Sequence, residues 1–207
     1  MKDRAALRRL FMAVPVVPDA PLLDLLADGR SHFRGDKIRW VVPEQMHITL
    51  KFLGETPAHR IEGLCRVFEE VASGHAPFSC RLEGAGLFGS RYAPRVIWVG
   101  TSDDAPLRAV GEAILESAAV SGFPRERLPF VPHLTLGRIT HLRDKQRLTE
   151  WITQQRGKPF GELPVTEVVL YESILRTTGA EHLVVKRFPL SNISNQHPSD
   201  HVSTSIR

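Results

Sequence analysis

The chain has 207 residues, of which 42% are hydrophobic and 24% are charged, a composition typical of a globular protein. This composition excludes a collagenous, coiled-coil or wholly disordered chain. A chain of this length buries roughly 70% of its unfolded surface, so it needs no disulfide or metal to fold. Lys and Arg outnumber Asp and Glu by 27 to 23, so the net charge is +4 with neutral histidines. Such a balance favours an anionic partner, but it does not separate nucleic acid from simple solubility.

Cysteine usage and hydropathy indicate the cellular compartment. The only two cysteines, Cys65 and Cys80, are typical of reduced, buried thiols in a cytosolic protein of this size. The stretch 8–17 resembles a short signal peptide, but Pro15 interrupts it and no small-residue cleavage site follows. No apolar run approaches the ~18 residues of a membrane helix. We therefore expect a cytoplasmic protein without membrane contact.

Strands and helices are predicted to alternate along the chain, from period-two alternation and from apolar residues at helical spacing respectively. In chain order they are a strand at 9–14, a helix from Pro18 to near Gly29, strands at 38–42 and 46–53, a helix from Pro57 to Gly74, strands at 78–82 and 95–100, a helix at about 105–118, a strand at 133–138, a helix at about 144–156, and strands at 166–175 and 182–188. Thr56 is expected to cap the second helix, and Gly84, Gly86 and Gly89 to form a link between two strands.

This order mixes hairpins with crossovers, which indicates an α+β fold with largely antiparallel sheets. Each half of the chain contains a strand, a helix and hairpin-type strands. We therefore predict two pseudo-symmetric lobes around a central cleft, forming a single bilobal domain over residues 1–190. The segment 191–207 is rich in Ser, Asn and His and has almost no apolar residues, so we expect a disordered polar tail.

The pattern His-x-Thr-Leu occurs twice, as His47-Ile48-Thr49-Leu50 and as His133-Leu134-Thr135-Leu136. The frequencies of His, Thr and Leu in this chain predict fewer than about 0.1 copies by chance. On a strand, alternation places the histidine and threonine on one face and the two apolar residues on the other. If the lobes are related by a pseudo-two-fold axis, the two His-Thr faces converge across the cleft.

Two imidazoles and two hydroxyls in one cleft fit in-line displacement at phosphorus. Histidine has an ordinary pKa near 6.5, so one ring can act as a base and the other as an acid at neutral pH. Threonine hydroxyls can bond the non-bridging oxygens, and a guanidinium such as that of Arg138 can neutralise their charge. Zinc is disfavoured because each motif offers one imidazole, and no Gly-x-Ser-x-Gly or nucleotide-binding loop is present.

Further segments around the motifs resemble a known family, the 2H phosphoesterases, and specifically the bacterial RNA 2′,3′-cyclic phosphodiesterases, also called 2′-5′ RNA ligases. The resemblance spans about 9–190. The similar segments are 9–11, 40–55, 86–89, 96–100, 130–138 and 170–173.

The resemblance implies a bilobal α+β fold and hydrolysis of a ribose 2′,3′-cyclic phosphate to a 2′-phosphomonoester without a metal or other cofactor. By the family pattern, His47 donates a proton to the departing 3′-oxygen and His133 activates water. Thr49 and Thr135 hold the phosphate, and Arg138 matches the family's arginine after the second motif. The same chemistry run backwards, with a ribose 5′-hydroxyl in place of water, joins RNA ends. The expected partners are RNA or nucleotide ends, bound by a monomer.

Three further residues are candidates for binding the substrate. Arg138 has the opposite parity to His133, so we expect the strand to end or bulge at Gly137. Lys51 shares parity with His47 and is expected either at the cleft or as a solvated lysine at the strand end. Four phenylalanines are candidates for base stacking, and Phe130 is preferred because it lies close to the second motif. The other three are Phe11, Phe52 and Phe88.

Two alternatives to RNA-end hydrolysis stay open. A non-catalytic module that binds RNA ends would use the same basic balance and the same phosphate-sized pocket. An enzyme with the same chemistry could act instead on a small nucleotide, such as a cyclic phosphate of an ADP-ribose derivative. The sequence does not decide among them, because loops form the pocket beyond the phosphate.

Overall fold

The structure is a computed structural model that describes residues 6–90, 92–125, 128–177 and 179–191. Apart from Ser191, the polar tail predicted at 191–207 lies outside the described residues. Within those residues, no helix is long and apolar enough to cross a bilayer.

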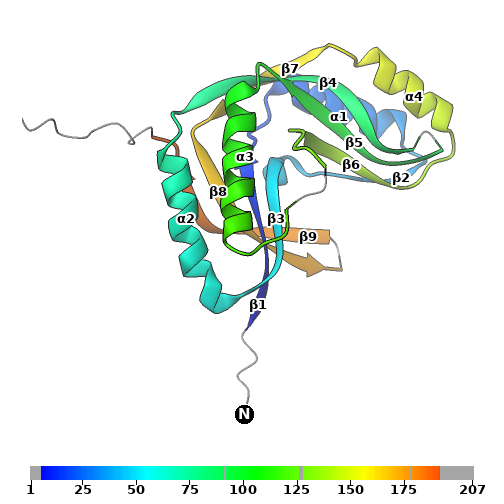
Figure 1. Cartoon of the computed structure of the whole chain (residues 1–207). Helices are drawn as coiled ribbons and strands as arrows, with labels where there is room; N and C mark the ends of the chain where they lie inside the picture. The colour runs from blue at the N-terminus through cyan, green and yellow to red at the C-terminus, as the bar shows by residue number, and fades with distance from the viewer. Residues whose placement is uncertain (1–5, 91, 126–127, 178, 192–207) are drawn as a thin grey trace, which may run out of the picture.

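Nine strands of the described chain form one curled sheet in which every pairing is antiparallel (Figure 1). The strands are β1 (Leu7–Pro15), β2 (Lys37–Trp40), β3 (His47–Pro57), β4 (Phe78–Ser90), β5 (Ala93–Ser102), β6 (Leu134–His141), β7 (Pro159–Val165), β8 (Glu167–Arg176) and β9 (Gly179–Pro189). Their order is β7-β4-β5-β6-β3-β1-β8-β9, and β2 pairs with β6 beside this path. The predicted α+β class with antiparallel strands is confirmed.

Four helices and two short 3-10 turns connect the strands of the described chain. They are α1 (Ala20–His32), η1 (Pro43–Gln45), η2 (Ala58–Arg60), α2 (Ile61–Ser73), α3 (Ala105–Val120) and α4 (Lys145–Gln154). Helices α2 and α3 lie side by side and contact β9 and β3 respectively, whereas α1 contacts β7 and α4 contacts β4 (Figure 1). Each half of the sheet therefore has its own pair of helices.

The two halves of the sheet meet between β3 and β6. Among the described residues, these strands pair at one position, where Ile48 lies opposite Leu134. From β3 the sheet continues through β1, β8 and β9, and from β6 it continues through β5, β4 and β7. The repeated tetrapeptides therefore lie at the junction of the two halves.

Aromatic side chains pack α2 onto the sheet and the end of α1 against α4. Phe68 of α2 meets Phe188 of β9 edge-on, with ring centroids 6.3 Å apart. Phe33, just after α1, meets Trp151 of α4 in the same way at 5.7 Å.

Both cysteines are buried and free, and burial raises the pKa of Cys80 to about 11. The thiols behave as small apolar core groups, as the sequence predicts.

Two helix boundaries differ from the prediction because the residues that were to set them have other roles. Helix α1 continues past Gly29 to His32, and the glycine is needed for packing, since a Cβ there would lie 2.7 Å from the Trp40 ring. Thr56 does not cap a helix. It is buried at the end of β3, and its hydroxyl donates to the Gly54 carbonyl at 3.2 Å.

The second half of the sheet contains more strand than predicted. The glycine-rich segment is part of β4, and Gly86 faces Trp98, whose ring would lie 2.2 Å from an added Cβ. Strand β7 was not predicted because Pro159, Gly161 and Pro164 interrupt its pattern. It lies at the end of the strand order, and proline is tolerated on an edge strand because one row of backbone N–H groups has no partner strand there.

Candidate active site

The two motifs lie side by side at the junction of β3 and β6. Ile48 and Leu134 are fully buried on the core side of the sheet. The four polar motif residues are half-buried: His47, Thr49, His133 and Thr135. In an antiparallel pair the positions flanking a paired residue lie across from one another. This register places His47 across from Thr135, and Thr49 across from His133.

Each motif contains a β-bulge at its final leucine. The register of β3 against β1 skips Leu50, and the register of β6 against β5 skips Leu136. An inserted residue reverses the faces of all the side chains that follow it. The fifth residue after each histidine, Phe52 or Arg138, therefore shares the face of that histidine. The irregularity expected at Gly137 is present one residue earlier.

Lys51 does not face the cleft, which corrects the parity argument. Its side chain is 4% exposed, and its ammonium donates to the Pro124 carbonyl at 2.6 Å. The bulge at Leu50 lies between His47 and Lys51 and turns the lysine to the other face of the strand. Lys51 is therefore a buried structural residue.

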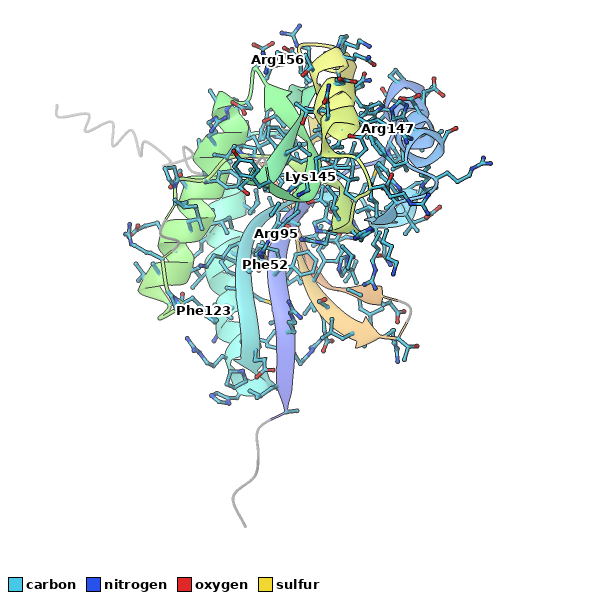
Figure 2. All side chains as sticks on the ribbon, turned by 90° about the vertical axis from the view of Figure 1, so that its right-hand side faces the viewer. Phe52, Arg95, Phe123, Lys145, Arg147 and Arg156 are labelled. Atoms are coloured by element: carbon cyan, nitrogen blue, oxygen red, sulfur yellow. The ribbon has the colours of Figure 1, made fainter. Side chains whose placement is uncertain are left out.

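An open cavity of about 800 Å³ lies over the face that carries the motifs. Its walls include His47, Thr49, Thr135 and Arg138. Phe52 also lines it and is 56% exposed, on the strand pair β1–β3 (Figure 2). Cavities of this size accommodate small organic ligands of several hundred daltons.

The cavity is strongly basic. Besides Arg138 it is lined by three arginines, from β1, β2 and β8: Arg9, Arg39 and Arg176. Among the described lining residues the one acidic group is Glu181, which pairs with Arg176 at 3.0 Å. The net positive charge favours an anionic ligand. Sequence reasoning missed these three arginines, since each lies on a different strand and belongs to no motif.

His47 lies in an aromatic enclosure. Its ring centroid is 5.1 Å from Phe11, 6.2 Å from Tyr171 and 5.1 Å from His182. Its Nδ1 is 2.7 Å from the Gln45 carbonyl oxygen. Burial lowers the pKa of His47 to about 4. The charge of Arg138, and those of His182 and His133 when these rings are protonated, act in the same direction, whereas the bond to Gln45 opposes them. The free protein therefore holds His47 neutral at pH 7.

His133 makes the corresponding backbone contact in a different setting. Its Nδ1 is 2.8 Å from the Val131 carbonyl oxygen. Its ring meets Phe88 edge-on at 4.7 Å and Trp98 at 6.4 Å. His133 does not contact the main cavity, although its charge acts on His47.

The two backbone contacts define the tautomer of each neutral imidazole. A carbonyl oxygen accepts only, so Nδ1 carries the proton in both His47 and His133 and donates it to the chain two residues earlier. The proton-free Nε2 of each ring is then the basic atom. Each of the two imidazoles can therefore take up or release a proton through its Nε2.

Phe130 is not a wall of the cavity. Its ring packs on α3, where Gly111 leaves room for it, since a Cβ at Gly111 would lie 2.2 Å from the ring. The preference for Phe130 rested on nearness in sequence, and the intervening turn directs its side chain to the helix. Phe52 in the cavity and Phe88 beside His133 are better placed to contact a base.

His182 of β9 is a further residue that sequence reasoning missed. It lines the cavity and contacts His47, but it belongs to no repeat. The described residues contain no group of three or more His, Cys, Asp or Glu side chains arranged to hold a metal ion.

Comparison with known proteins places these features in a family. The model for LigT-like phosphoesterases matches residues 14–98. An RNA 2′,3′-cyclic phosphodiesterase of Aquifex aeolicus is 34% identical over 155 residues, covering 73% of this chain and 81% of that protein. One of Geobacillus stearothermophilus is 33% identical over 195 residues, covering 87% of this chain, and this chain spans 56% of that protein's length.

A solved structure shares the fold. That of Escherichia coli LigT complexed with 3′-AMP superposes with a TM-score of 0.68 and 26% sequence identity, covering 89% of this chain and 98% of that one. The similarity extends over both halves of the sheet.

Proposed function

The chain belongs to the LigT-like, or 2H, phosphoesterase family, and from that premise we propose that it hydrolyses 2′,3′-cyclic phosphates at RNA or nucleotide ends to 2′-phosphomonoesters. One observation carries the proposal. Two imidazoles with the same tautomer lie across from two threonine hydroxyls, beside a basic cavity of about 800 Å³.

His133 acts as the base and His47 as the acid. Nε2 of His133 takes a proton from water, and the water oxygen forms a bond to phosphorus. The bond between phosphorus and the 3′-oxygen breaks, and the 3′-oxygen takes the proton from Nε2 of His47. The product carries a 2′-phosphate and a free 3′-hydroxyl. Each proton transfer contributes typically 10²–10⁴-fold to such a reaction.

The low pKa of His47 makes its protonation dependent on the substrate. At pH 7 the ring of the free protein is neutral, because burial disfavours its charged form. The bound cyclic phosphate carries one negative charge, which stabilises an imidazolium beside it. Substrate binding therefore raises the pKa of His47 and supplies the acid that the 3′-oxygen needs.

The remaining groups of the site bind the phosphate. Hydroxyls of Thr49 and Thr135 donate to the non-bridging oxygens, and the exposed guanidinium of Arg138 neutralises their charge. Arg9 and Arg39 extend the positive charge of the cavity wall, where the next phosphates of an RNA end can follow. A 5′-hydroxyl in the position of the water would give the reverse reaction, 2′-5′ joining.

Product analysis tests the proposal directly. The purified protein, treated with EDTA, is incubated with adenosine 2′,3′-cyclic phosphate, and the isomer formed is identified by chromatography or ³¹P NMR. We expect only the 2′-phosphate. Formation of the 3′-phosphate would reverse the assignment of the leaving oxygen.

The second candidate function, a non-catalytic module for RNA ends, rests on the four arginines of the cavity wall. It predicts tight binding of a cyclic-phosphate RNA end with no product after hours. That outcome, with both histidines intact, would contradict hydrolysis.

A further inference from the structure

His182 is a third histidine of the cavity wall, outside both repeated motifs. It lies on β9 opposite Ser173 of β8. It lines the main cavity and also a second cavity of about 380 Å³, and His47 borders both as well. His182 therefore lies at the position where a ligand in the main cavity would contact His47, the acid of the proposed reaction.

Neighbouring rings fix the orientation of His182. Its ring meets His47 edge-on, with centroids 5.1 Å apart and planes at 79°, and meets Phe11 at 4.9 Å and 71°. Aromatic pairs of this geometry are favourable and hold their rings in place. The two nitrogens of His182 therefore have defined surroundings.

Those surroundings differ between the two nitrogens. Nδ1 of His182 is sealed from solvent and has no hydrogen-bond partner among the described residues. Nε2 makes no hydrogen bond within these residues either, but it is open to solvent. Among backbone groups, a buried N–H without an acceptor is rarer than a buried carbonyl without a donor, and most buried side-chain polar atoms are bonded. The ring therefore carries its proton on Nε2, where the cavity can supply an acceptor.

The state of His182 is opposite to that of the two motif histidines. His47 and His133 hold their protons on Nδ1, bonded to backbone carbonyls, and present a basic Nε2. Burial, reinforced by the charge of Arg138, lowers the pKa of His182, so its ring is neutral at neutral pH and retains a single proton.

We propose that His182 binds the substrate as a neutral hydrogen-bond donor, with its Nε2–H directed to a non-bridging oxygen of the phosphate held by Thr49, Thr135 and Arg138. The donor supports the phosphate on the side of His47 without competing with it for a proton. This inference rests on the proposed function for the identity of the ligand. The tautomer of the free protein is independent of turnover.

NMR of the ¹⁵N-labelled protein tests the tautomer. Long-range ¹H–¹⁵N correlations at pH 7.5 distinguish a proton on Nδ1 from one on Nε2. We expect Nδ1–H for His47 and His133 and Nε2–H for His182. A proton on Nδ1 of His182 would overturn the inference.

Binding of 2′-AMP, the proposed type of product, tests the contact in the full chain by calorimetry. His182→Phe keeps a ring against His47 but removes the donor, and we expect affinity to fall about tenfold to hundredfold. His182→Gln places an amide N–H near the position of Nε2 and should stay within about threefold of wild type. His141→Phe is the matched control, because His141 is exposed at the far end of β6, outside both cavities.

The outcomes separate this inference from the proposed function. Unchanged 2′-AMP binding by His182→Phe, or equal losses in His182→Phe and His182→Gln, would overturn the donor role even if wild type hydrolyses the cyclic phosphate. A loss confined to His182→Phe would support the donor role even if wild type gave no product.

Discussion

His47 and His133 begin two copies of the same His-x-Thr-Leu motif, with the same bulge at the final leucine and the same contact from Nδ1 to the chain two residues earlier. Their surroundings differ. Three rings enclose His47, and burial lowers its pKa to about 4. His133 instead lies against Phe88 and Trp98, outside the wall of the main cavity.

The comparison separates what the motif determines from what its setting determines. The motif, through the backbone contact, sets the tautomer and therefore which nitrogen reacts. Packing by neighbouring strands sets how readily that nitrogen is charged. Two copies of the His-x-Thr-Leu motif can thereby serve as unlike partners in one acid-base reaction.

Removing either imidazole should have the largest effect on activity. His47→Ala and His133→Ala should each lower kcat about 10²–10⁴-fold, because each proton transfer is lost. The double variant should lose less than the product of the two effects, since the rings act as a unit. Initial rates with the cyclic mononucleotide measure this. More than a tenth of the wild-type rate in both single variants would contradict the acid-base pair.

Acid should destabilise the fold through His47. Its folded pKa of about 4 lies below the unfolded value of 6.5, so the unfolded chain binds the extra proton. The contribution of neutral His47 to the free energy of unfolding is fully present above pH 6.5. It is lost as the pH falls towards 4, by up to about 3 kcal/mol. Urea unfolding of wild type and His47→Gln at pH 7.5 and 4.5 measures it. An identical pH dependence in the two proteins would exclude a buried neutral His47.

Lys51 follows the first motif and Arg138 the second. Replacing Lys51 by alanine should lower stability, whereas replacing Arg138 should lower activity. Lys51→Ala should cost about 2–3 kcal/mol of stability, because a buried side chain and its bond to Pro124 are lost, with kcat/KM little changed. Arg138→Ala should lower kcat/KM about tenfold to hundredfold with little loss of stability. Urea unfolding measures the free energy of unfolding of both variants, and steady-state kinetics measure their kcat/KM. A loss of activity in Lys51→Ala at full stability would place the lysine in the site.

Much of the fold follows from local pattern, and the differences have local physical reasons. Alternation predicted β1, β3, β8 and β9, and helical spacing predicted the apolar face of α2. The prediction misplaced two boundaries at glycines. In sequence, a glycine that ends a helix or strand cannot be distinguished from one that leaves room for a tryptophan ring. Gly29 and Gly86 are of the second kind. Proline similarly hid β7, since pattern alone does not reveal which strand lies at an edge.

The repetition of a rare tetrapeptide indicated the motif residues of the candidate site, but not the residues around them. Simple alternation fails beyond the bulges, so it placed Lys51 at the cleft, while Arg138 needed an irregularity that Gly137 suggested. His182 is distant in sequence, and the successive pairings of β3 with β1, β1 with β8 and β8 with β9 bring it to His47. Such a residue gives no signal in a single sequence.

Within the described residues, the single pairing of Ile48 with Leu134 gives the molecule a sensitive point on the core side of the sheet, on the face opposite the reacting groups. Each of these residues directly follows a histidine, and the two histidines lie diagonally across this pair, so the spacing of the strands contributes to the distance between the rings. A bulkier side chain at either position would spread the strands and tune which anions fit, with every polar group left in place.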